Sequence, residues 1–246
     1  MAWLSPMIWT FLRTLALFTS APIFSSKVVP VRARIALAFF VALAAQPSLD
    51  GQPLISINDP GAYGAVVQQV GIGLAIGFGI RVVFSAVELA GEVVGFQMGL
   101  SFASFFDPTM GGQSSAVARF FGQMATFMFV VMNGHVMVLM TVIKSFVAFP
   151  VDQNFLVALK QMKIYELGGD IFAAGLWMAL PMVGMLMFAN LALGIVSRVA
   201  PQMNIYAIGF PITLTVGLVG IAVTLPMLDQ PFLALMSRVM DIFSPR

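Results

Sequence analysis

The chain has 246 residues, of which 60% are apolar and only 9% are charged, and its formal net charge is +2. Soluble domains carry about 25% charged residues, so this composition excludes a soluble enzyme and predicts an integral membrane protein. The small net charge also excludes a nucleic-acid-binding surface. The sequence has no cysteine and one histidine, which excludes disulfides and metal centres that need two histidines. We expect no cofactor and no active site.

The apolar residues fall into six blocks separated by short polar or proline-containing segments. The second block is too short to cross a bilayer, which requires about 20 apolar residues, and the third and sixth are nearly twice as long as one crossing. Unequal blocks favour broken helices and helical hairpins over simple crossings. We therefore predict one all-α membrane domain over residues 1–246, with no soluble domain. The blocks are 6–24, 35–46, 62–100, 119–149, 171–196 and 205–243.

The first two connections between blocks carry opposite charges. Residues 25–34 contain Lys27, Arg32 and Arg34 and no acid, whereas residues 46–61 contain two aspartates and no base. Basic loops of membrane proteins face the cytoplasm. This pattern predicts that the first connection is cytoplasmic and that the N-terminus lies outside.

Glycines recur at four-residue spacing along the third block. Such steps place them on one helix face, where another backbone can approach closely, as at many helix contacts in membranes. The pattern is compatible with a contact inside this chain and with a contact to another subunit. The glycines are Gly73, Gly77, Gly91, Gly95 and Gly99.

Three charged residues, Arg81, Glu88 and Glu92, lie in the same apolar block on a similar helix face. Charges within a membrane are costly, so we expect them to face protein or water and to find partners. A proton or ion pathway is one interpretation. Structural pairing, or a position outside the bilayer core, is the other and the one that we favour.

The segment after the third block contains a cluster of aromatic residues followed by a turn. Phe102, Phe105 and Phe106 share one helix face. Asp107 and Pro108 then stop this helix or begin a new one, with the aspartate as N-cap. The flexible loop that follows consists of Thr109, Met110, Gly111, Gly112 and Gln113. The loop lacks the lysine and the spacing of a P-loop, which excludes nucleotide binding.

Two groups of residues interrupt the later blocks. Glycine weakens a helix, while asparagine and histidine bring hydrogen-bonding groups into apolar surroundings. A proline inside an apolar stretch removes a helix hydrogen bond and bends the axis. We therefore expect helix breaks or contacts between helices at Asn133, Gly134, His135, Pro201, Gly209 and Pro211.

The chain resembles the FliR family of flagellar type III export-gate subunits in three segments: GEVVGFQMGLSFASFFDP at 91–108, FVVMNGHVMVL at 129–139 and LALGIVSRVAPQMNIYAIGFPITLTVG at 191–217. Their order and spacing match over nearly the whole chain, beginning with SAPIFS at 20–25. The SctT family of virulence secretion systems is similar, but GFPITLTVG resembles the flagellar branch more closely.

The resemblance implies a non-enzymatic subunit of a helical, ring-like gate in the bacterial inner membrane, within the flagellar basal body. FliP-like and FliQ-like subunits build this gate, which passes unfolded flagellar proteins outward, and FlhA-like and FlhB-like components complete the machine. The family's loop after the DP motif helps to plug the pore, and this loop maps to Phe106–Ser114 here. The alternative is a small ion-coupled transporter that uses Arg81, Glu88 and Glu92; an intramembrane enzyme comes third because it lacks a catalytic set.

Overall fold

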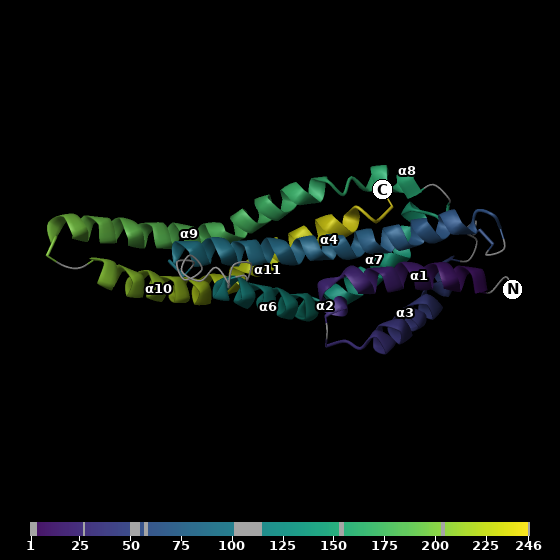
Figure 1. The fold of residues 1–246 in the computed structure, drawn as a ribbon, viewed down its shortest axis with the longest axis horizontal. Coiled ribbons are helices and arrows are strands. Elements are labelled where there is room, and N and C mark those ends of the chain that lie inside the picture. The colour runs from purple at the N-terminus through teal and green to yellow at the C-terminus, as the bar shows by residue number, and fades with distance from the viewer. Residues whose placement is uncertain are drawn as a thin grey trace. The chain divides into compact units, whose positions relative to one another are not determined.

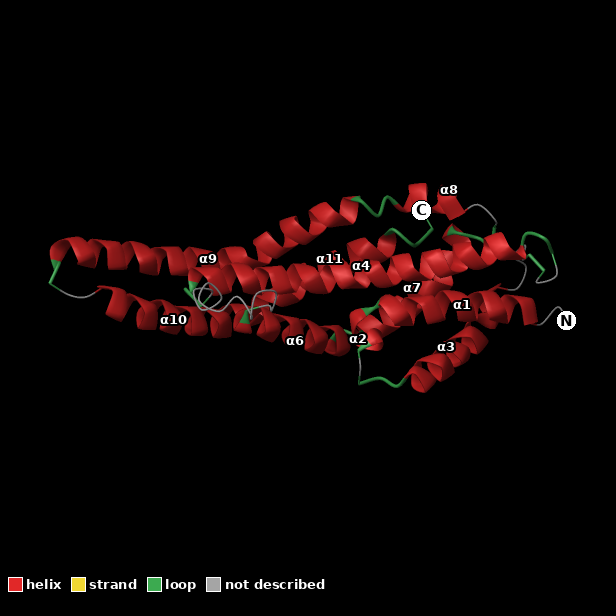
Figure 2. Cartoon of the chain, in the orientation of Figure 1, coloured by secondary structure: helices red, strands yellow, loops and turns green. Residues whose placement is uncertain are grey.

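Helices make up the structure wherever the chain is described. The computed structural model describes residues 4–26, 28–49, 55–56, 59–100, 115–152, 155–202 and 205–245, and in these ranges it has helices and no strand (Figure 2). In chain order (Figure 1) the elements are α1 (Leu4–Ser20), α2 (Pro22–Ser25), α3 (Val31–Ala45), the 3-10 helix η1 (Gln46–Leu49), α4 (Ala62–Gln97), α6 (Ala116–Val131), α7 (Gly134–Ala148), α8 (Phe155–Met162), α9 (Glu166–Val199), α10 (Ile205–Thr224), the 3-10 helix η3 (Leu225–Leu228) and α11 (Asp229–Asp241).

The described helices confirm the all-α membrane class that composition predicts. Three segments, Ala62–Gln97, Phe155–Val199 and Ile208–Asp241, are long and apolar enough to cross a membrane. The pair α6 and α7 is a fourth candidate, bent by 68° at its break. Phe155–Val199, Ile208–Asp241 and the α6–α7 pair each contain a break between helices, as the unequal apolar blocks predict.

The third apolar block, however, forms one continuous helix. Helix α4 runs for 36 residues without a break. It contains no proline, so no hydrogen bond of its ladder is lost to a missing N–H group. By contrast, Pro226 lies in the 3-10 helix that separates α10 from α11 within the sixth block.

Contacts divide the chain into two compact units. The first comprises residues 1–83, 129–169 and 235–246, and the second comprises residues 84–128 and 170–234. The boundaries fall inside α4, α6, α9 and α11. One domain over residues 1–246 remains a prediction.

In the first unit, α1 is the central partner of neighbouring helices. Its Trp9, Leu17 and Phe18 side chains are buried, and the indole N–H of Trp9 donates a hydrogen bond to the carbonyl of Ile55 at 3.0 Å. Helix α3 packs beside α1 (Figure 1). Its buried side chains are small: Ala38, Ala42 and Ala45. Burial of these faces is favourable because it removes apolar surface from water or headgroups.

In the second unit, aromatic and thioether side chains fill the space between helices. The rings of Phe84 and Phe232 meet edge to face, with centroids 6.4 Å apart, which is a favourable aromatic geometry. Phe121 of α6 is fully buried, and Met98 occupies the space beside Gly217 of α10. Flexible methionine side chains fill such irregular gaps well.

The candidate spans differ in how much of their surface this chain covers. Within an 18-residue apolar window, 67% of α4 is buried, compared with 17% for Phe155–Val199 and 28% for Ile208–Asp241. Helix α4 is therefore the core helix of the chain. The later helices leave most of their apolar surface for lipid or for other proteins.

Candidate functional site

The first two glycines of α4 allow α1 to approach closely. A Cβ atom at Gly73 would overlap the backbone carbonyl of Arg13, and one at Gly77 would lie 2.9 Å from the carbonyl oxygen of Leu17. Real Cβ atoms essentially never approach other atoms this closely, so only glycine fits here. These two positions bring helices of the same chain together.

The next two glycines of α4 allow α6 to approach. A Cβ atom at Gly91 would lie 2.7 Å from the Cα atom of Ala118, and one at Gly95 would lie 3.1 Å from the hydroxyl of Ser115. The contact at Gly91 is therefore backbone to backbone, while Gly95 leaves slightly more room. All four glycines contact helices of this chain.

Gly99 has a different environment, because it follows the end of α4. Its φ angle is 77°, in the left-handed region that favours glycine. The N–H group of Leu100 donates to the carbonyl of Gly95 at 3.1 Å, as at helix ends capped by a left-handed glycine. Gly99 thus terminates α4 immediately before the segment with the aromatic cluster.

Two of the three charges of α4 face α6. The Glu92 carboxylate accepts a hydrogen bond from the backbone N–H of Ser115 at 2.8 Å, while the Ser115 hydroxyl accepts one from the N–H of Ala118 at 3.1 Å. This arrangement resembles a capping box in which the acid comes from another helix. The Glu88 carboxylate lies beside Gly122, where a Cβ atom would be 3.0 Å from its oxygen. Arg81 is exposed.

The break predicted in the fourth block lies between α6 and α7. Asn133 has a φ angle of 55°, a left-handed conformation that asparagine tolerates better than most residues. Gly134 begins α7, and a Cβ atom there would lie 2.5 Å from the ring of Phe129. His135 is half-buried. The asparagine thus supplies the turn and the glycine supplies the room that the 68° bend requires.

Of the predicted positions near the α9–α10 connection, Gly209 lines a cleft in the second unit, whereas Pro201 and Pro211 do not. A cavity of about 500 Å³ is bordered by Gly99, Gly194 and Gly209, together with Asn190 and Thr213. Pro211 lies inside α10, whereas Pro201 is exposed in the turn after α9. The Thr213 hydroxyl lies 3.4 Å from the Met98 carbonyl, to which it donates a hydrogen bond. The cleft therefore has apolar walls with a few polar groups.

The predicted plug residues lie outside the described part of the chain. This holds for Phe102, Phe105, Phe106, Asp107, Pro108, Thr109, Met110, Gly111, Gly112 and Gln113. The described residues that flank them are Leu100, after the capped end of α4, and Ser115, held by Glu92. The described residues on either side, Leu100 and Ser115, therefore both lie beside α4 in the second unit.

A fully buried arginine, Arg13, was not among the predicted site residues. Arg13 of α1 donates three hydrogen bonds: from Nε to the Gln69 side-chain oxygen at 2.8 Å, from Nη1 to the Ser145 hydroxyl at 2.8 Å, and from Nη2 to the Phe149 carbonyl at 2.9 Å. Its guanidinium carbon lies 3.6 Å from the ring centroid of Phe146. The cluster joins α1 to α4 and to the end of α7.

The electrostatics of Arg13 involve neutral acceptors rather than a carboxylate. Helix α1 is not among the candidate spans, and desolvation there lowers the pKa of Arg13 well below its ordinary value. The C-terminal end of α7, which carries a partial negative charge, and the face of the Phe146 ring both favour the cation. The sequence feature that could have indicated this site is Arg13 itself, a base in an apolar block with no acid among the first 49 residues.

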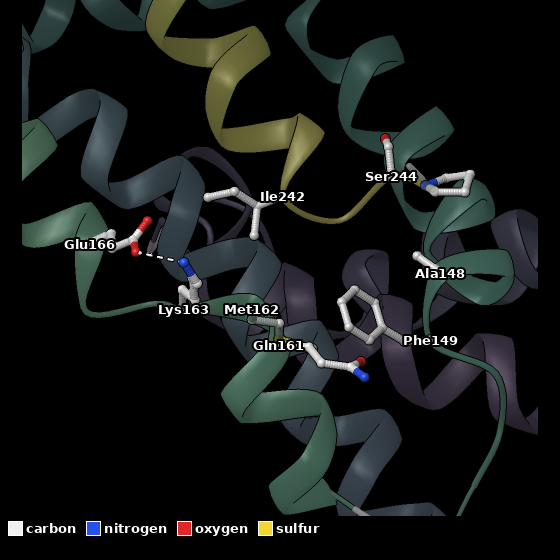
Figure 3. A pocket seen from close by; sticks show the side chains of 9 residues that line it. Ala148, Phe149, Gln161, Met162, Lys163, Glu166, Ile242 and Ser244 are labelled. Carbon is white, nitrogen blue, oxygen red and sulfur yellow. Dashed lines mark ion pairs between the residues drawn. The ribbon is translucent and has the colours of Figure 1, made fainter.

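A second cavity, of about 420 Å³, lies in the first unit (Figure 3). Its wall contains an ion pair between the Lys163 ammonium and the Glu166 carboxylate, 3.2 Å apart, and both side chains are more than half exposed. The remaining wall is formed largely by apolar groups such as Phe149, Met162 and Ile242. An exposed ion pair of this kind contributes little to stability.

Comparisons with known proteins agree with the resemblance in the sequence. The family model "Bacterial export proteins, family 1" matches residues 4–239. A protein of Pectobacterium carotovorum subsp. carotovorum named flagellar biosynthetic protein FliR is 37% identical over 244 residues, which cover 98% of this chain and 92% of the relative. The Escherichia coli K12 protein of that name is also 37% identical, covering 99% and 95%, and that of Bacillus subtilis 168 is 32% identical, covering 87% and 83%. The chain therefore belongs to family 1 of the bacterial export proteins, the FliR family of flagellar biosynthesis and export.

Proposed function

We propose that this chain, a subunit of the flagellar export apparatus, joins FliP-like and FliQ-like subunits in a channel that passes unfolded flagellar proteins across the bacterial inner membrane. The observation that carries the proposal is the unequal burial of its apolar helices. In the window of Phe155–Val199 only 17% is buried by this chain, against 67% for α4. Large apolar surfaces of this kind mark contacts with other proteins or with lipid.

The surface of α9 has features that suit contact with another helix. At Gly184 and Gly194, among the described residues, no atom apart from the local backbone of α9 lies within 4 Å of the position that a Cβ atom would take, so their faces are open in this part of the chain. Asn190 between them is exposed in the otherwise apolar stretch 171–196 of the helix. Small residues allow close approach, and a polar amide in apolar surroundings gains from a partner. We assign assembly to α9 and α10, since the glycines of α4 already contact this chain.

We also propose that Phe106–Ser114 closes the channel at rest. This proposal rests on the family resemblance and on the sequence, in which Met110 and neighbouring glycines combine apolar contact with conformational freedom. The fixed ends of the segment support it, because the Gly99 cap and the Glu92–Ser115 hydrogen bond hold both ends beside α4. Apolar constrictions can close a pore by excluding water.

The contacts of Glu88 and Glu92 disfavour an ion-coupled transporter. Glu92 accepts the backbone N–H of Ser115, and Glu88 lies against α6 beside Gly122. A carboxylate that caps a helix is less available to carry ions or protons, because it would have to leave a hydrogen bond in each cycle. The role of an export subunit agrees with the family to which the chain belongs.

A crosslinking experiment tests the assembly. We would place the photoreactive residue p-benzoylphenylalanine at Phe188, a residue of α9 that is 74% exposed, and use the fully buried Phe121 as the matched control. The tagged full chain is irradiated in cells that express the FliP-like and FliQ-like proteins. We expect an adduct to one of these proteins from position 188 only. Purification of the chain alone, with no such adduct and with substrate uptake in liposomes, would support the transporter instead.

A further inference from the structure

Helix α3 carries an apolar surface that the other described residues do not cover. It contacts α1 through Ala38, Ala42 and Ala45. The large apolar side chains exposed along it are Val31, Ile35, Leu37, Phe39, Phe40 and Leu43, with Phe40 64% exposed. On a helical wheel with about 100° per residue, the exposed side chains from Ile35 round to Leu37 span an arc of roughly 200°.

This arc is wider than one neighbouring helix covers. A packed helix buries a stripe of about 100°, and the buried alanines of α3 already give a stripe of roughly 60° to α1. The exposed remainder is a convex apolar surface that faces in several directions. Lipid tails adapt to such a surface without a complementary shape.

The length of α3 also distinguishes it from a membrane-spanning helix. Its 15 residues correspond to about 22 Å, which is less than the roughly 30 Å of a hydrocarbon core. Prolines at positions 30 and 47 flank it. One end of the helix must therefore remain near a membrane surface if its apolar arc contacts lipid.

The charges of α3 identify which end of the helix lies near the membrane surface. Arg32 is exposed within the first turn and lies in the middle of the apolar arc, and no acidic side chain pairs with it among the described residues. The first acid in the sequence is Asp50. The basic end thus has no counter-charge in the neighbouring sequence, whereas the rest of the exposed arc is apolar.

A second arginine fixes the geometry of this basic end. Nη2 of Arg34 donates to the carbonyl oxygens of Ser25, Ser26 and Val29 at 3.2, 2.8 and 3.1 Å. These contacts hold the connection after α2 against the first turn of α3. Arg34 is therefore occupied by the backbone of this chain, and Arg32 is left to face outward.

We propose that α3 is a lipid-binding element, in which Arg32 contacts the phosphate of an anionic phospholipid while the apolar arc contacts its acyl chains. The combination of an exposed base and an adjoining apolar surface is that of interfacial membrane segments. It agrees with the cytoplasmic position predicted for residues 25–34, since anionic lipids are enriched on that side of membranes. The proposal does not depend on the export channel.

Crosslinking distinguishes whether the exposed apolar face of α3 contacts lipid or protein. With p-benzoylphenylalanine at Phe40 of the full chain in cell membranes, intact-mass analysis should show the added mass of a phospholipid. Phe18 of α1, which is fully buried, is the matched control and should react only within the chain. A protein adduct as the main product at position 40 would overturn the proposal, and would leave the channel proposal standing.

A charge variant tests the headgroup contact. The purified full chain in detergent is given equal amounts of phosphatidylglycerol and phosphatidylethanolamine, and retained lipid is counted by native mass spectrometry. Arg32→Gln should lower phosphatidylglycerol retention about fivefold, the effect of one basic residue at an anionic surface, while Arg32→Lys should retain most of it. Arg198→Gln, which removes another exposed arginine, should change little. Equal loss in both glutamine variants, or no loss in either, would overturn the assignment to Arg32.

Discussion

Nε of Arg13 donates a hydrogen bond to the Gln69 side-chain oxygen at 2.8 Å, in a site where both residues are buried. A buried cation is costly unless it is hydrogen-bonded. Here α4 supplies the amide oxygen, and α7 supplies a hydroxyl and the carbonyl at its end. The guanidinium therefore binds three separate acceptors at once and fixes α1 to both helices.

Replacing Arg13 should unfold or destabilise the first unit. Arg13→Met leaves the Gln69 oxygen, the Ser145 hydroxyl and the Phe149 carbonyl without this donor. We expect a loss of at least about 3 kcal/mol, since each buried group left unsatisfied costs about 1–3 kcal/mol. Thermal unfolding in detergent measures the effect. Arg13→Lys should recover only part of the loss because an ammonium cannot reproduce the planar fork, and Arg198→Met is the exposed control. Stability equal to that of the unaltered chain would contradict the proposed role.

A side chain at Gly91 should force α4 and α6 apart. In Gly91→Ala the new Cβ atom would lie 2.7 Å from a backbone atom of Ala118, which cannot move away as the end of a flexible side chain can. We expect a loss of about 1–3 kcal/mol, typical of overpacking. Gly169→Ala provides the comparison, because nothing lies within 4 Å of its Cβ position. If both variants melted at the same temperature as the unaltered chain, the close α4–α6 contact would be refuted.

The larger substitution Gly95→Leu should reduce recovery of the assembled complex. Gly95 faces Ser115 and Val117 of α6, so a leucine would displace the start of that helix. Co-purification with FliP-like proteins is expected to fall sharply, through the altered fold of this chain. Full recovery of the complex would show that the α4–α6 contact has no bearing on assembly.

Removing the acceptor oxygen of Glu92 should weaken the start of α6. Neutralising Glu92 should leave any proton dependence of export unchanged. Glu92→Gln keeps an oxygen for the Ser115 N–H, whereas Glu92→Ala removes it and should cost about 1 kcal/mol, as for other lost helix caps. The measurements are protein abundance, complex formation and flagellar export. A Glu92→Gln or Glu88→Gln variant that assembles normally, yet exports only when the external pH is changed, would revive the transporter interpretation.

Deleting Thr109–Gln113 should open the channel without preventing assembly. The deletion leaves the Gly99 cap and the Glu92–Ser115 hydrogen bond intact, and it removes the apolar Met110 that would fill the pore. We expect a normal complex on a native gel and a loss of membrane potential, read with a potential-sensitive dye in the same cells. Deletion cells that keep a normal potential with an assembled gate would assign closure to another element.

Composition and local sequence pattern determined the class of this protein and the position of a helix break. Few charges and long apolar blocks required a helical membrane protein, because a backbone in lipid must satisfy its own hydrogen bonds. Asn133 and Gly134 marked the break between α6 and α7 for a local reason, since left-handed backbone and a missing side chain suit a bend. The motifs were specific enough to indicate the family.

The tertiary structure decided which residues meet. Arg13 is 56 positions from Gln69 and 132 from Ser145, so no periodicity in the sequence could connect them. Gly91 and Gly99 have the same spacing pattern, yet one contacts another backbone and the other caps a helix. In the sequence, Glu92 is only a charge within an apolar block. In the structure, the packing of α6 places the Ser115 N–H within hydrogen-bonding distance of the Glu92 carboxylate. A residue's partners depend on how distant segments pack, whereas composition and helix period report only on the segment itself.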